Sequence, residues 1–363
     1  MANTFVPGAI WPDNNGVHIN AHGGGVLLHR GVYYWFGEHK TEGEAGNFAH
    51  VGVHVYSSND LYNWTDEGIA LSVVQDDPAH DIAAGCIIER PKVIYNAKTN
   101  KFVMWFHLEL KSTGGYGSTS CSGIAISDTP AGPYQYVRSV QPNAGKWPMN
   151  VLDCHKEAVC PEVQETEFCG GGLPAHPDEI NLLGKNFSAG QMARDMTLFV
   201  DDDGKAYHIY SSESNSTAHI AELTDDYQGH TGKYMRAFVA RWMEAPAIFK
   251  RQGKYYWIAS GCTGWAPNTA RYSVANSIWG PWMEVGNPCV GEGADLTFGG
   301  QSTYVLPVAG KQDAFIFMAD IWNPENAIDG RYVWLPIAFE EINTAPGIKI
   351  AWWDKWDLSF FDK

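Results

Sequence analysis

The feature that most constrains the fold is a pair of short strands that recurs five times along the chain. In each copy a polar residue begins an apolar strand, a turn follows, and a second strand rich in aromatic residues comes next. Aromatic and β-branched runs divided by turn residues predict β-hairpins. The five hairpins span residues 21–37, 89–106, 194–210, 244–258 and 301–318. Such repetition indicates an architecture built from copies of one sheet.

Further strand and turn signals follow the hairpins, for example at 54–64, 123–134 and 272–282. A unit of about four strands, repeated with insertions, is typical of a propeller blade. Helical periodicity is weak throughout. We therefore predict an all-β fold, a five-bladed β-propeller that forms a single domain over residues 1–363. A β-sandwich is the competing fold, but five similar units favour radial closure.

The longest departure from the repeat is a segment of about residues 141–190, between the second and third units, rich in Pro, Gly, Cys and charge. Loops of this length are usually functional or mobile. Two interpretations stay open: a cap near the substrate entrance on one face of the propeller, or a surface decoration.

Charge excludes several classes of partner. The formal net charge is −16, which repels phosphate backbones and anionic lipids, so we expect no nucleic-acid and no membrane partner. No apolar run reaches the roughly 18 residues needed to span a bilayer.

No signal peptide is recognisable after Met1. We expect a cytoplasmic protein, or a secreted or periplasmic one if a signal peptide was removed, acting as a monomer.

The seven cysteines show no C-x-x-C or Cys/His zinc spacing, so no metal site is assigned from them. Cys154, Cys160 and Cys169 cluster in the 141–190 segment, where a disulfide or a metal clip is one interpretation. Buried free thiols are the other.

Polar residues stand where the five hairpins begin. The innermost strand of each blade runs beside the propeller axis, so equivalent positions of these strands converge on one cavity. Aligned by their hairpins, these positions hold His22, Glu89, Asp195, Glu244 and Gln301. Three carboxylates at equivalent positions would be costly to bury without a purpose. The pattern therefore predicts a functional site on the axis.

Paired carboxylates in a cleft are typical of enzymes that hydrolyse glycosidic bonds. One carboxyl group must stay protonated to donate to the leaving oxygen, and its neighbours can raise its pKa. A group opposite steers water or attacks the anomeric carbon. Aromatic residues make up 13% of the chain, and most should pack between blades, leaving a few rings for sugar faces. A polysaccharide or oligosaccharide is the expected partner.

Several segments resemble glycoside hydrolase family 43, and most closely its galactan-active branch of exo-β-1,3-galactanases and β-1,3-galactosidases. The resemblance covers nearly the whole chain outside the 141–190 segment. The matching motifs are Ala21-His22-Gly23-Gly24-Gly25, Tyr34-Trp35-Phe36-Gly37-Glu38, Glu89-Arg90-Pro91-Lys92-Val93, Gln191-Met192-Ala193-Arg194-Asp195-Met196-Thr197, Glu244-Ala245-Pro246-Ala247, Ser260-Gly261-Cys262-Thr263-Gly264-Trp265 and Gly300-Gln301-Ser302-Thr303.

The resemblance implies a role for each matching position. Glu244 matches the general acid, and Asp195 matches the carboxylate that adjusts the pKa of the acid and holds the substrate. The family's usual base is an Asp on the first inner strand, where this chain offers His22 and glycines. Gln301 matches a residue near the attacking water, which it orients directly or activates as an imidic tautomer. Glu89 matches a sugar contact and is the alternative base. The family is inverting, so inversion is expected.

The resemblance also suggests further residues that could contact the sugar, although some of them could have structural roles instead. The candidates are Glu38, His22, Tyr116, Asn215, Thr263 and Trp265. Asn215 could instead serve a turn, and Tyr116 could close a Gly-rich loop. His22 could instead bind an axial water or a central ion such as calcium, or support the core. No cofactor is required for catalysis, although a structural calcium ion is compatible with the sequence.

The sequence thus predicts an exo-acting hydrolase that releases galactose from β-1,3-galactan, the arabinogalactan backbone. Exo-α-L-arabinofuranosidase, β-galactofuranosidase and β-xylosidase activities of the same family are alternatives. The missing first-blade Asp argues against the typical arabinofuranosidase and xylosidase patterns. A non-catalytic carbohydrate-binding propeller is the alternative of another class, and the presence of Glu244 disfavours it.

Overall fold

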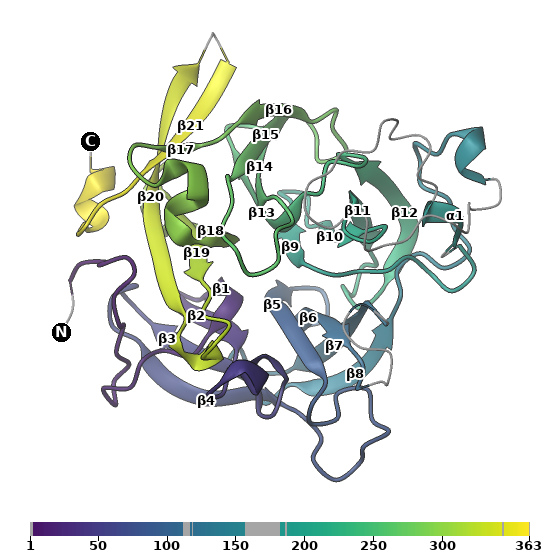
Figure 1. Ribbon diagram of the computed structural model, residues 1–363, viewed down its shortest axis with the longest axis horizontal. Helices are drawn as coiled ribbons and strands as arrows, with labels where there is room; N and C mark the ends of the chain where they lie inside the picture. Colours follow the sequence, from purple (N-terminus) through teal and green to yellow (C-terminus); the bar gives the residue numbers. More distant parts are fainter. Residues whose placement is uncertain are drawn as a thin grey trace.

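Five β-sheets surround a central axis in the computed structural model of the chain (Figure 1). The structure describes residues 3–111, 117, 119–156, 182–185, 187–342 and 345–362. The fold is a five-bladed β-propeller, as the repeats predict. Tyr116, Cys160 and Cys169 lie outside the described residues.

The sheets follow one another along the chain as blades one to five. Blade one contains β1 (His22–His29), β2 (Val32–Glu38), β3 (Gly52–Ser58) and β4 (Thr65–Ser72). Blade two contains β5 (Ile87–Asn96), β6 (Lys101–Glu109), β7 (Cys121–Ser127) and β8 (Gln135–Val140). Blade three contains β9 (Met196–Val200), β10 (Ala206–Ser212), β11 (Thr217–Leu223) and β12 (His230–Ala237). Blade four contains β13 (Glu244–Arg251), β14 (Lys254–Ser260), β15 (Arg271–Ala275) and β16 (Met283–Gly286).

Blade five has an extra short strand. It contains β18 (Gln301–Pro307), β19 (Phe315–Ile321), β20 (Arg331–Ile342) and β21 (Ala345–Ala351), with β17 (Cys289–Val290) parallel to β21. The described helices are short: α1 (Leu182–Lys185) and 3₁₀ segments at Glu44–Asn47, Asp153–Lys156, Ala294–Gly299 (which is kinked), Ala327–Asp329 and Leu358–Phe361. Within the described part of the chain, no helix has the length and apolar character needed to cross a membrane.

Aromatic side chains fill the spaces between blades. Trp35, Trp105, Trp257 and Trp334 lie on β2, β6, β14 and β20, and each is fully buried. Large flat rings exclude much water per residue, which suits wedge-shaped spaces between twisted sheets. The two ends of the chain add to the contact between blades one and five: Phe5 exchanges backbone hydrogen bonds with Trp356, and their rings stack at 4.5 Å.

The inner strands share an irregularity that matters for the site. His22 and Glu244 pair with the last residue of the second strand of their blade, and Glu89 pairs with His107 near the end of β6. A β-bulge follows each pair. The next residue is left-handed in all three blades, with φ of 62° at Gly23, 56° at Arg90 and 53° at Ala245. Bulges of this kind bend a strand and redirect its side chains. The bulges occupy equivalent positions in three blades, which matches the alignment of the hairpins.

Candidate active site

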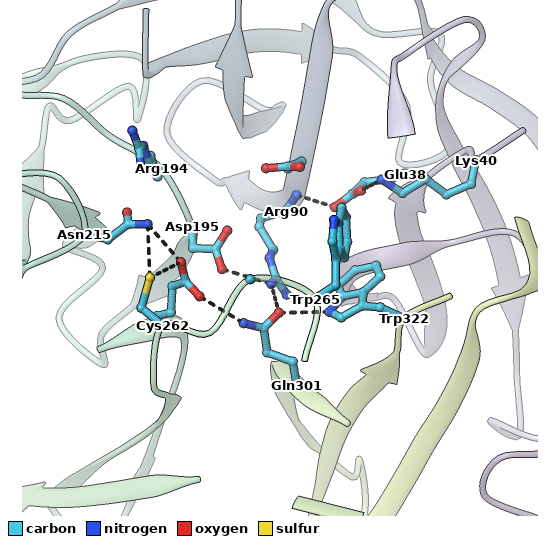
Figure 2. A pocket seen from close by; sticks show the side chains of 13 residues that line it. Glu38, Lys40, Arg90, Arg194, Asp195, Asn215, Cys262, Trp265, Gln301 and Trp322 are labelled. Carbon is cyan, nitrogen blue, oxygen red and sulfur yellow. Dashed lines mark hydrogen bonds and ion pairs between the residues drawn. The ribbon is translucent and has the colours of Figure 1, made fainter. Parts of the chain in front are cut away.

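A cavity of about 370 Å³ opens on the axis, where the inner strands begin (Figure 2). Residues from all five blades line it, because every inner strand brings its first residues to this end. The lining residues are Glu38, Lys40, Glu89, Arg90, Arg194, Asp195, Asn215, Glu244, Cys262, Gly264, Trp265, Gln301 and Trp322.

Glu244, the first residue of β13, is held on both of its oxygens. Oε1 accepts hydrogen bonds from Asn215 Nδ2 at 2.9 Å and from Cys262 Sγ at 3.3 Å. Oε2 accepts from Gln301 Nε2 at 3.3 Å. Burial, followed by the nearby charge of Asp195, raises the pKa of Glu244 to about 8. This carboxyl group is therefore mainly protonated at neutral pH and can donate a proton.

The amide of Gln301 is oriented by four hydrogen bonds. Its Oε1 accepts from Arg90 Nη2 at 2.6 Å and from Trp322 Nε1 at 2.9 Å. Its Nε2 donates to Ser260 Oγ at 3.0 Å and to Glu244 Oε2. A primary amide has two acceptor positions and two N–H groups, so these contacts use its full capacity. The nitrogen side of the amide consequently faces the acid.

Arg90 joins Gln301 to the carboxylates around it. Its Nη2 also lies 2.9 Å from Asp195 Oδ2, its Nη1 donates to the backbone oxygen of Ser302 at 3.1 Å, and its backbone N–H donates to Glu38 Oε1 at 2.9 Å. Burial opposes the charge of Arg90, but the surrounding carboxylates, led by Asp195, hold its pKa above the usual value. The guanidinium also lies 5.2 Å from the ring centroid of Trp322, within range of a cation–π interaction.

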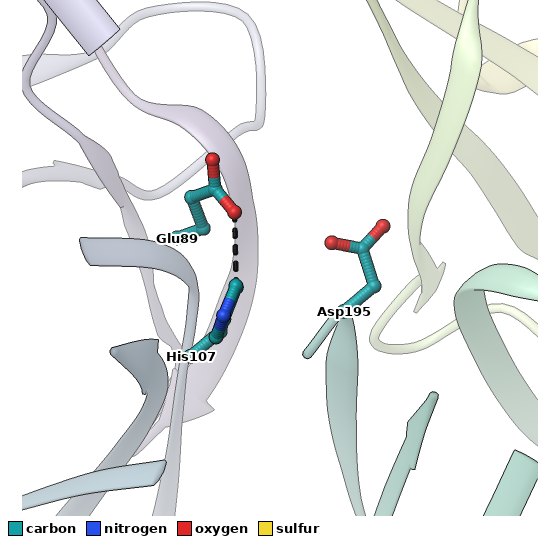
Figure 3. Close-up of side chains that lie close together, drawn as sticks. All are labelled: Glu89, His107 and Asp195. Atoms are coloured by element: carbon teal, nitrogen blue, oxygen red, sulfur yellow. Dashed lines mark hydrogen bonds and ion pairs between the residues drawn. The ribbon is translucent and has the colours of Figure 1, made fainter. Parts of the chain in front are cut away.

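Glu89, near the start of β5, is paired with a buried imidazole (Figure 3). His107 Nδ1 lies 2.9 Å from Glu89 Oε2, and its Nε2 lies 3.1 Å from Glu109 Oε1. Burial opposes both charges. The hydrogen bond and charge of His107 nevertheless lower the pKa of Glu89 to about 2, and the two glutamates raise the pKa of His107 to about 9. Glu89 is thus a stable carboxylate and a weak proton acceptor.

Glu89, His107 and Asp195 are the described residues that could gather around a metal ion, because one ligand atom from each lies within 4.8 Å of the others (Figure 3). Both nitrogens of His107 are already hydrogen-bonded to glutamates. Since a doubly hydrogen-bonded, protonated imidazole has no lone pair to offer, these side chains favour an ion pair over metal coordination.

Aromatic and charged groups form one side of the cavity. Glu38 Oε2 lies 2.5 Å from Lys40 Nζ, and burial raises the pKa of Glu38. Trp265 meets Trp322 edge to face, with ring centroids 5.8 Å apart. Trp265 is 43% exposed, although it lines the cavity, so its indole remains open to a ligand.

Seven of the predicted site residues line the cavity: Glu38, Glu89, Asp195, Asn215, Glu244, Trp265 and Gln301. Thr263 does not line it, because its side chain is used within its own loop, where Oγ1 donates to the backbone oxygen of Ala266 at 2.6 Å. Tyr116 lies outside the described residues.

His22 takes the core position that is one of its interpretations from the sequence. Its side chain is 0% exposed and stacks on Tyr332, with ring centroids 5.3 Å apart. It also fills the space against Gly330, where a Cβ would lie 2.7 Å from the ring. Its location does not fit a sugar contact. Burial keeps its pKa well below the usual value, so the ring is neutral and supports the core between blades one and five.

Several lining residues were not assigned from sequence, among them Lys40, Arg90, Arg194, Cys262 and Trp322. Arg90 could have been found, because it follows Glu89 directly and shares the bulge position of Gly23 and Ala245. Trp322 could not be separated from the other 14 tryptophans by sequence alone.

Comparison with known proteins agrees with this geometry. The model of the family "Glycosyl hydrolases family 43" matches residues 178–321. A solved family 43 β-1,3-galactosidase with galactodeoxynojirimycin is 51% identical, with 98% of this chain and 100% of that chain covered and a TM-score of 0.88. This chain belongs to glycoside hydrolase family 43. It is a glycoside hydrolase, which excludes the non-catalytic propeller, and its partner is a carbohydrate.

Two other relatives differ in what they are named for. An exo-β-1,3-galactanase from Phanerochaete chrysosporium, solved with galactose, is 31% identical, with 98% of this chain and 68% of that chain covered and a TM-score of 0.74. A β-D-galactofuranosidase from Aspergillus niger is 29% identical over 151 residues, which are 37% of this chain and 43% of that protein. The match thus spans less than half the length of the Aspergillus protein.

Proposed function

We propose that this family 43 enzyme releases galactose from the non-reducing end of β-1,3-galactan. The observation that carries the proposal is Glu244, a carboxyl group held on both oxygens inside a cavity of about 370 Å³, with a pKa raised to about 8. Ligand pockets span roughly 300–1,000 Å³, so this one is small and suits a chain end better than a long stretch of polymer. The 51% identical β-1,3-galactosidase, which is covered along its whole length, supports galactose as the released sugar.

Glu244 is the proposed general acid. It keeps its proton near neutral pH and can pass that proton to the leaving oxygen. Asp195 contributes negative charge that raises the pKa of the acid, while its ion pair with Arg90 keeps its own carboxylate in place. Asp195 is therefore proposed to tune the acid and to hold the substrate.

Gln301 is proposed to position the attacking water from its nitrogen side. The bond to Glu244 is the longest of its four hydrogen bonds, at 3.3 Å, and is the one most readily exchanged for water. Arg90 and Trp322 both donate to the amide oxygen, which fixes the nitrogen side of Gln301 toward the cavity. Glu89, with a pKa of about 2, suits a sugar hydroxyl contact better than proton abstraction.

Hydrolysis of debranched arabinogalactan tests the assignment. The wild-type enzyme should release galactose as the sole early product, and proton NMR should show the α-anomer first, as expected for inversion of a β-linkage. Glu244→Gln should abolish turnover. A ladder of oligosaccharides from the outset, or near-normal activity of Glu244→Gln, contradicts the proposal.

Galactofuranoside hydrolysis is a second candidate, which the partial similarity to the Aspergillus niger enzyme supports. Nitrophenyl β-D-galactofuranoside, compared with nitrophenyl β-D-galactopyranoside and β-1,3-galactan, separates the two. Faster turnover of the furanoside than of the galactan would favour this candidate.

A further inference from the structure

The turn between β10 and β11 has an unusual backbone. Glu213, Ser214 and Asn215 are three consecutive residues in the left-handed region, with φ of 50°, 57° and 65°. None is glycine, and all three are buried. Side chains in this region strain the backbone, and such residues persist where the surroundings hold them. The turn therefore needs an anchor.

Glu213 provides that anchor through a buried ion-pair cluster. Arg236 on β12 donates from Nε to Oε1 at 2.8 Å and from Nη2 to Oε2 at 2.7 Å. His219 Nε2 lies 2.7 Å from Oε1 of the same carboxylate. All three side chains are at most 3% exposed. A two-pronged contact of this kind fixes direction as well as distance.

Residues from the first part of the 141–190 segment form hydrogen bonds with Arg236. Asn150 accepts from the backbone N–H of Arg236 at 3.0 Å and donates to its backbone oxygen at 2.8 Å. The His155 ring lies 3.0 Å from Arg236 Nη1, and Met149 bonds to the backbone of Tyr234. Residues 149–155 thus pack against β12.

The described residues near the end of the same segment reach the site from another direction. Leu182 of α1 packs with Trp242 and Cys262 in one apolar cluster. The Gln191 side chain ties down this helix by donating to the backbone oxygen of Leu183 at 3.1 Å. The described parts of the 141–190 segment therefore support two neighbours of Glu244. One is the turn that carries Asn215, and the other is Cys262.

In the cavity, Asn215 and Cys262 both donate to Oε1 of Glu244. An oxygen that already receives two donors is a poor place for the acidic proton. Oε2 accepts one bond of 3.3 Å, from Gln301, and is therefore the better position for the acidic proton.

We propose that Glu213, Arg236 and residues 149–155 form a positioning network that holds the left-handed turn and so keeps Asn215 on Oε1 of the acid Glu244. This inference rests on the proposed function, because it takes Glu244 as the proton donor. Glu213 and Arg236 are not among the residues that line the cavity, so the proposal has them act through Asn215.

The sign of the expected effect follows from the groups that face Glu244. Asp195 opposes its ionisation, whereas Arg90, Arg194 and the Cys262 thiol favour it. An N–H donor such as Asn215 also stabilises the carboxylate. Loss of the Asn215 contact should therefore raise the pKa of Glu244 above about 8.

The experiment compares Asn215→Ala, Glu213→Gln and the double variant. The titration of Glu244 is read in the free protein by infrared difference spectra against the matching Glu244→Gln protein, so that no substrate is needed. We expect each single variant to raise the pKa by about one unit, which corresponds to one hydrogen bond of about 1.4 kcal/mol. kcat on β-1,3-galactan should fall roughly tenfold, with the double variant no worse than either single one.

Glu284→Gln is the matched control, because it weakens a two-pronged contact to Arg241 that is partly exposed and lies outside the cavity. It should leave the Glu244 titration unchanged. If Glu213→Gln does not fold, Arg236→Lys replaces it, since lysine keeps the charge but loses the two-pronged contact.

A shift in Asn215→Ala alone, with wild-type titration in both Glu213→Gln and Arg236→Lys, would overturn the inference. Additive shifts in the double variant would overturn it as well. The proposed function fails separately, by the absence of galactose release from wild-type enzyme, and that outcome leaves the infrared result interpretable.

Discussion

The guanidinium of Arg90 donates a 2.6 Å hydrogen bond to the amide oxygen of Gln301, a residue 211 positions away in the sequence. This contact decides which end of the amide faces the acid. With the oxygen held by Arg90 and Trp322, the nitrogen points to Glu244. The orientation of this side chain, a poor base, is thus set in part by Arg90, which reaches it from blade two across the axis.

Replacement of Arg90 by lysine tests this relationship. A single ammonium group cannot contact Gln301, Asp195 and the Ser302 backbone together. We expect kcat to fall roughly 100-fold, since small misplacements at a reacting centre cost about that much, while KM changes less. Steady-state kinetics on β-1,3-galactan measures this.

The control for that prediction is Arg251→Lys, which alters an ion pair with Asp313 outside the cavity and should leave kcat unchanged. Wild-type kcat in Arg90→Lys would show that the orientation of Gln301 does not depend on the guanidinium.

The alkaline side of the pH profile should report Glu244. Because the acid must be protonated to act, activity is present below its pKa and is lost as the pH rises through it. With a pKa of about 8, kcat/KM should fall to half near pH 8 and then about tenfold per pH unit. A profile that is flat up to pH 10 would contradict the assignment of Glu244 as the acid.

His107→Gln should change the acidic side of the same profile. Without the charged imidazole, burial is opposed by the charges of Lys40 and Arg90 but no longer by His107, so the pKa of Glu89 rises from about 2. Activity that needs the Glu89 carboxylate should then be lost at higher pH than in wild type, mainly through a larger KM.

His54→Gln is the matched control, since it removes another His–carboxylate pair, with Asp66, at 2.7 Å in blade one. A shift of equal size in both variants would indicate a general loss of stability instead of a local effect on Glu89.

Trp265→Ala should raise KM by up to about tenfold and leave the melting temperature nearly unchanged. Aromatic contacts contribute roughly 0.5–1.5 kcal/mol, and a side chain that is 43% exposed contributes little to the core. Trp353→Ala is the comparison, because Trp353 is equally exposed but packs on Phe360 near the C-terminus. Equal KM values for the two variants would remove Trp265 from the site.

The sequence alone determined the fold and the residues that begin the inner strands. Hairpin repeats are local patterns, and side-chain alternation and turn chemistry depend on near neighbours. Glu244, Asp195, Glu89 and Gln301 could therefore be placed on one axis before any contact was known.

The tertiary structure decided where those side chains point and how they ionise. His22 begins an inner strand yet packs against blade five, whereas Arg90, one residue past its equivalent position, enters the cavity. Asn215 reaches the acid through a left-handed turn held by Glu213. Orientation and pKa depend on burial and on charges from other blades, which are distant in sequence, so no local pattern could contain them.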